Sequence, residues 1–137
     1  MRTVLVPVGH EIEASRALSR VAGLAARGGD RVVVLHVHET ERDAKGCVRT
    51  QQEPDLDCIA AIVARTLRGA GIPADWQSVT ADVGELATAI AAVAADVHAE
   101  VVVVGDVPTW LSTHQGVHAQ LERLLPDTQV VAVRNPC

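Results

Sequence analysis

The sequence predicts one α/β domain built on an open parallel sheet with helices on both faces. Four short runs of β-branched and aliphatic residues recur along the chain, at residues 3–8, 31–37, 101–104 and 129–133. Each run is apolar without alternation, which is typical of parallel strands covered on both faces. Amphipathic segments separate the runs, so strands and helices alternate. A chain of 137 residues is long enough for one well-buried domain and short for two, so residues 1–137 are expected to form a single domain.

The first two connections are predicted to be helices. Apolar residues recur at helical spacing over residues 14–25 and again over residues 56–67, where Pro54 suits the first turn. Both stretches are followed by glycines, which readily end a helix. These glycines are Gly28, Gly29, Gly69 and Gly71.

The last two connections are also predicted to be helices, and each begins with a capping box. In a capping box, a small polar residue precedes Glu or Gln by three positions. The two pairs are Asp82 with Glu85 and Ser112 with Gln115. The first pair precedes an apolar stripe over residues 86–97, and the second precedes a stripe over residues 117–124 that Pro126 ends.

Two further segments complete the predicted topology. Residues 75–79 alternate polar and apolar, as a strand at the edge of a sheet does, and give a fifth strand. Residues 38–53 form a long polar connection, which is read either as an ordinary surface loop or as a lid. The alternation requires right-handed crossovers, and a ligand is expected at the carboxyl ends of the strands, where the strand order reverses.

Composition excludes several classes of function. The net charge is -5 and the twelve basic residues are scattered, so no basic footprint for nucleic acid is present. Trp76 and Trp110 are the only aromatic residues, too few for a base-stacking platform. The three cysteines form no C-x-x-C pair, which fits a reducing cytoplasm. Because the apolar run near the N-terminus is too short for a secretion signal and no stretch could span a bilayer, we expect a cytoplasmic protein without a membrane partner.

The order of these segments resembles the universal stress protein family over nearly the whole chain. The matching segments are VLVPVG at 4–9, EASRAL at 13–18, VVVLHV at 32–37, residues 71–90, VVVVGD at 101–106 and GVHAQLERLLPDTQVVAVR at 116–134. The resemblance implies a five-stranded parallel sheet of strand order 3-2-1-4-5 and assembly as a dimer. It also implies pairing through the last strand, Gln129 to Val133, a flat run without Pro or Lys that a second copy would cover.

The family contains members that bind ATP and members that do not, and the resemblance implies that this chain is a non-binder. Binders have Asp directly after the valine-proline-valine of the first strand, and a G-x-x-G-x9-G-[ST] loop whose glycines and N–H groups hold the phosphates. Here Gly9 occupies the aspartate position, and Pro108, which has no N–H to donate, occupies that of the second glycine. Gly105 and Gly116 are eleven positions apart where the pattern has thirteen, and Val117 replaces the hydroxyl residue.

The charge around this loop also disfavours a triphosphate. Asp106 adds a negative charge at its mouth, and no Lys or Arg lies between Gly105 and Gln120. The sequence therefore predicts a remnant nucleotide crevice with no bound cofactor. Its residues are Gly9, His10, Gly105, Asp106 and Gly116.

Histidines near the same edge suggest a metal ion as an alternative ligand. His10, His38, His114 and His118 follow predicted strands, and the last two are four positions apart, a spacing that can chelate Zn²⁺ on one face of a helix. Glu11, Asp106 or Cys47 could complete such a site. A solvent-facing rim of histidines is the simpler interpretation, so His114 and His118 remain weak candidates and no metal is assigned. His36, within the second strand, is expected to pack in the core.

No set of residues in the sequence supports catalysis. Ser15 falls in the first predicted helix, Ser112 and Thr113 look like helix caps, and no nucleophile elbow is present. Trp110 is expected to plug the crevice or to anchor a partner. The leading prediction is a non-enzymatic dimeric stress-response module that acts on an unidentified regulatory partner. The alternative is a small-ligand binder that holds an adenine nucleotide or a metal ion at the carboxyl edge, and a hydrolase ranks third.

Overall fold

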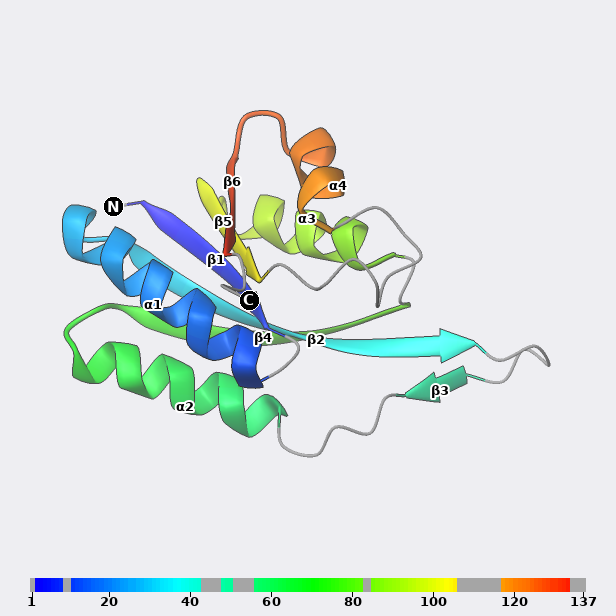
Figure 1. The fold of residues 1–137 in the computed structure, drawn as a ribbon, viewed down its shortest axis with the longest axis horizontal. Helices are drawn as coiled ribbons and strands as arrows, with labels where there is room; N and C mark the ends of the chain where they lie inside the picture. Colours follow the sequence, from blue (N-terminus) through cyan, green and yellow to red (C-terminus); the bar gives the residue numbers. More distant parts are fainter. Residues whose placement is uncertain are drawn as a thin grey trace.

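A parallel sheet of five strands forms the centre of the fold (Figure 1). The computed structural model describes residues 2–8, 11–42, 48–50, 56–82, 85–105 and 117–133. The parallel strands are β1 (Thr3–Val8), β2 (Arg31–Arg42), β4 (Ala74–Asp82), β5 (Val101–Gly105) and β6 (Gln129–Val133). A short strand, β3 (Val48–Thr50), pairs antiparallel with the end of β2. The helices are α1 (Glu11–Gly28), α2 (Leu56–Gly69), α3 (Leu86–Asp96) and α4 (Val117–Leu124).

The strand order agrees with the prediction. The parallel strands lie in the order β4-β2-β1-β5-β6, which is 3-2-1-4-5 when only the parallel strands are numbered along the chain. β1 is central, and β4 and β6 are the two edges. The chain runs outward from β1 through β2 to β4, and then returns past both strands to β5, so the order reverses between β1 and β5.

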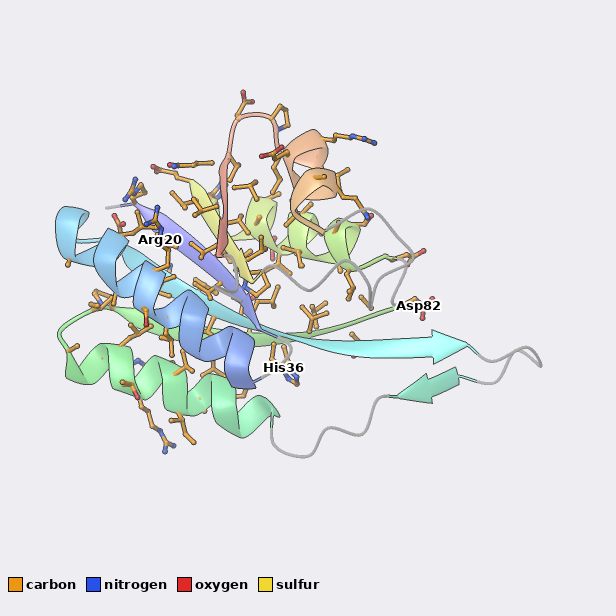
Figure 2. The ribbon with its side chains drawn as sticks, viewed as in Figure 1. Arg20, His36 and Asp82 are labelled. Carbon is orange, nitrogen blue, oxygen red and sulfur yellow. The ribbon has the colours of Figure 1, made fainter. Side chains whose placement is uncertain are left out.

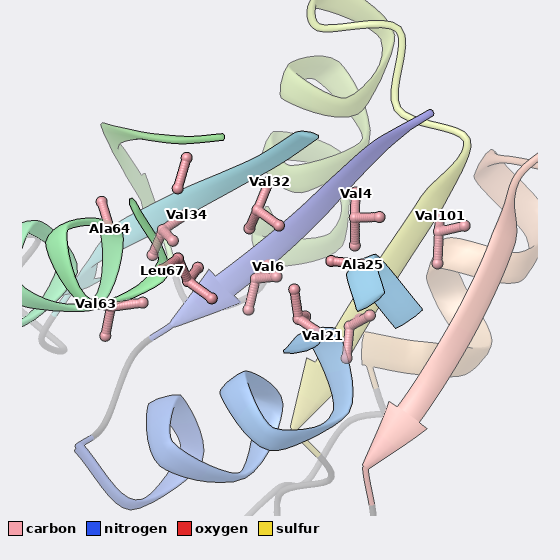
Figure 3. Packing of buried hydrophobic residues seen from close by; sticks show 12 residues of the cluster. Val4, Val6, Val21, Ala25, Val32, Val34, Val63, Ala64, Leu67 and Val101 are labelled. Atoms are coloured by element: carbon pink, nitrogen blue, oxygen red, sulfur yellow. The ribbon is translucent and has the colours of Figure 1, made fainter. Parts of the chain in front are cut away.

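The sheet is covered on both faces, which explains why its central strands are apolar without alternation. Val4 and Val6 of β1 pack against α1 and α2, as Figure 3 shows, whereas Leu5 packs on the other face with α3 and α4. These three side chains are at most 1% exposed. Among the described residues, no helix is long and apolar enough to cross a membrane.

The glycines that were predicted to end the first two helices do so through left-handed backbone. Gly71 has φ 82°, and the N–H of Ile72 donates to the carbonyl of Leu67 at 2.9 Å while the N–H of Gly71 donates to Arg68 at 3.0 Å. This is a Schellman motif, which satisfies the last carbonyls of α2. At the end of α1, Gly29 has φ 66° and donates to the carbonyl of Ala25 at 3.1 Å.

The capping box predicted at Asp82 and Glu85 is wrong. Asp82 is the last residue of β4, where it pairs with Thr40 of β2, so its backbone belongs to the sheet. The N-cap of α3 is Glu85, and its side chain makes no capping hydrogen bond. Asp82, which the local sequence predicts as a helix cap, is instead part of a strand, because its backbone pairs with β2. The second box, Ser112 with Gln115, lies outside the described residues.

The second strand is longer than predicted. β2 continues past Val37 to Arg42, and β4 extends over Ala74–Asp82 where only residues 75–79 were expected. The two strands pair over nine residues, from Val32 with Ala74 to Thr40 with Asp82. The connection predicted over residues 38–53 therefore contributes the end of β2 and all of β3. Backbone pairing, which polar side chains do not prevent at a sheet margin, explains the difference.

A buried carboxylate lies directly after α1, and a glycine makes room for it. Asp30 is 1% exposed, and the guanidinium of Arg2 donates to its two oxygens at 3.1 Å and 2.8 Å. A Cβ atom on Gly28 would lie 2.9 Å from one of these oxygens. Gly23, in the same helix, has nothing within 4 Å of the corresponding position.

The two glycines should therefore respond differently to alanine. We expect Gly23→Ala to raise the free energy of unfolding by about 0.5–1 kcal/mol, since alanine is the better helix former. Gly28→Ala should show no gain or a loss, because the new methyl group displaces the Asp30 carboxylate from Arg2. Urea unfolding of the two variants measures the difference. Equal gains would show that Asp30 adjusts without cost.

The end of α3 carries a residue in a strained conformation. His98 has φ 55°, and the N–H of Ala99 donates to the carbonyl of Ala94 at 2.9 Å. Because a left-handed residue with a Cβ atom costs about 1–2 kcal/mol and glycine costs more entropy on folding, His98→Gly should stabilise the protein by roughly 0.5 kcal/mol. Gly71→Ala, the reverse change at the matching position of α2, should destabilise it. Thermal unfolding measures the change in melting temperature for each variant. A lower melting temperature for His98→Gly would show that the left-handed backbone at His98 is not strained.

Candidate functional site

The reversal of strand order places the candidate site at the carboxyl ends of β1 and β5. These neighbouring strands pair in parallel through Val4 with Val101 and Leu5 with Val102, and they end at Val8 and Gly105. Each helix that follows a strand runs back along the sheet, so α1 and α4 begin at this edge. The partial positive charge of a helix N-terminus favours an anionic group there.

One of the five predicted crevice residues lies within the described part of the chain. Gly105 is the last residue of β5 and pairs with Val133 of β6, so it closes the strand as expected. The other crevice residues lie outside the described residues, and their role stays a prediction: Gly9, His10, Asp106 and Gly116. The same holds for Cys47, Pro108, Trp110, Ser112, Thr113 and His114.

Four histidines lie within the described residues: His36 in the core, His38 and His118, which are placed only by their backbone, and His98 at the end of α3. His36 is 1% exposed on β2, and by strand alternation it shares the face of Val32 and Val34 beneath α1 and α2 (Figure 2). This confirms the expected core position. His38 was expected after the strand, but it lies within β2 and pairs with Thr80. His118 is the second residue of α4.

The metal prediction is not tested by the described residues. They contain no group of three or more His, Cys, Asp or Glu side chains that could hold a metal ion. His114, the other half of the predicted chelate, lies outside them. The pair with His118 therefore stays a prediction.

Three ion pairs of the described residues lie at the other end of the strands, where β1, β2 and β4 begin. Arg2 and Asp30 precede β1 and β2, and their atoms Nη2 and Oδ2 are 2.8 Å apart. Asp75, at the start of β4, accepts from Arg31 at 2.6 Å and from Arg68 at 3.2 Å. The hydrogen bond from Arg31 lowers the pKa of the Asp75 carboxyl, and the hydrogen bond to Asp30 raises the pKa of Arg2. These three arginines are engaged far from the carboxyl edge, where a phosphate group would lie.

Sequence reasoning did not find this charged network. Each of its acidic members stands immediately before or at the start of a strand, where an isolated charge resembles ordinary loop composition. The pairing of distant strand ends brings the charges together, because Arg2 and Asp30 are 28 positions apart and Arg31 and Asp75 are 44 apart. The sequence held one clue to this network: Gly28 and Gly29 precede Asp30, and Gly28 leaves the space that the Asp30 carboxylate occupies.

Comparison with known proteins identifies the relationship of the chain. The model of the universal stress protein family matches residues 1–115. None of the curated proteins matches the chain. A solved universal stress protein in complex with cAMP is 20% identical, with a TM-score of 0.69 over 97% of this chain and 96% of that one.

Two further solved structures agree with this result. The universal stress protein from Archaeoglobus fulgidus in complex with dAMP is 20% identical, with a TM-score of 0.65 over 97% of this chain and 98% of that one. A universal stress protein family protein from Arabidopsis thaliana with AMP bound is 15% identical, with a TM-score of 0.70 over 100% of this chain and 93% of that one. At these identities the structures show a common fold. Because the family model spans most of the sequence, the chain belongs to the universal stress protein family.

Proposed function

We propose that this protein is a non-enzymatic, dimeric stress-response module of the cytoplasm that does not bind ATP and acts through a regulatory protein partner. The observation that carries the proposal is the loop that follows β5. Its glycines, Gly105 and Gly116, are two positions too close for the phosphate-binding pattern, and Pro108 removes an N–H from the middle of it. Gly9 also lacks the carboxylate that would meet the adenine side.

The distribution of charge supports the absence of ATP. A triphosphate needs several cationic or N–H donors, because each unpaired phosphate oxygen loses its hydration on binding. The loop carries no Lys or Arg up to Gln120, and Asp106 adds a negative charge to it. The guanidinium groups of Arg2, Arg31 and Arg68 bind carboxylates near the amino ends of the strands.

The position of Ser15 supports a role without catalysis. Ser15 lies inside α1, more than a turn from its first residue, and not on a sharp turn where a nucleophile would be presented. The sequence contains no nucleophile elbow elsewhere. A binding and signalling role requires none of these groups.

A second candidate function is the binding of an adenine nucleoside monophosphate. The relatives described above hold cAMP, dAMP or AMP, each of which carries one phosphate group. One phosphate needs fewer donors than three, and the N-terminus of α1 lies at the carboxyl edge that such a ligand would occupy. A shortened loop is therefore a smaller obstacle to a monophosphate than to ATP.

Thermal unfolding in the presence of nucleotides separates the two functions. A ligand at a hundred times its dissociation constant stabilises a fold by about 2.7 kcal/mol, which raises the melting temperature by several degrees. We expect no such rise with millimolar Mg-ATP, and GTP serves as the control for unspecific effects. A rise with ATP would overturn the non-binder assignment, whereas a rise with AMP or cAMP alone would favour the second function.

The dimer is proposed to form along the free edge of β6. On one side β6 pairs with β5 from Gln129 to Val133. No other described strand lies along its second side. Because the N–H of Gln129 donates to Glu100, the alternation of a parallel ladder directs the N–H groups of Gln129 and Val131 toward β5 and that of Val130 toward the free side.

A proline at Val130 should therefore weaken the dimer and leave the fold intact. Val130→Pro removes a donor from the free side of β6, whereas Val131→Pro would remove one that pairs with β5. We expect sedimentation velocity to show a lower average mass for Val130→Pro than for the parent chain, at unchanged circular dichroism. A parent chain that sediments as a monomer, or a Val130→Pro variant with undiminished association, would place the interface elsewhere.

A further inference from the structure

We draw no further inference here: the strongest candidate, the exposed edge of β4 around Trp76, carries no proposal because nothing in the structure shows what covers it.

Discussion

The rest of the structure depends on the burial of β1 on both faces. Val4, Leu5 and Val6 contact two separate cores, one beneath α1 and α2 and one beneath α3 and α4. A strand in this position can carry no polar side chain without a partner, and its neighbours must be parallel so that the crossover helices can cover them. The central position of β1 then determines where the order of the sheet reverses, and hence which loops can share a ligand.

The two ends of the sheet have different electrostatic roles. The amino ends hold the paired charges Arg2, Asp30, Arg31 and Asp75, which join β1, β2 and β4. Interactions of this kind contribute modestly where they are exposed and more where a carboxylate is buried, as Asp30 is. The carboxyl ends instead provide helix N-termini and loops. These ion pairs thus lie at the end of the strands opposite to the one where open α/β sheets generally bind ligands.

The fold could be predicted from the sequence because its main determinants are local or periodic. The apolar runs around Val4, Val32 and Val102 identify strands that are buried on both sides, and Gly29 and Gly71 identify helix ends that need positive φ. Asp82 was misassigned because a cap signal and a strand end look alike until the pairing partner, Thr40, is known. The extension of β2 was missed for the same reason. The buried pair of Arg2 and Asp30 could not be found, since residues 28 positions apart meet only through the topology. The candidate site is defined mainly by sequence motifs, because Gly105 alone among the five predicted crevice residues lies within the described part of the chain.

The two open edges, β4 and β6, lie at opposite ends of one continuous sheet. A self-complementary contact at one edge alone closes a pair and stops. The two edges differ in what they offer to a second chain. At the start of β4 the Arg68 side chain already donates to the outward carbonyl of Ala74 and to Asp75. A hydrogen-bond acceptor that is occupied in this way cannot serve a foreign strand, so Arg68 shields one end of this edge much as an inward-pointing charge does.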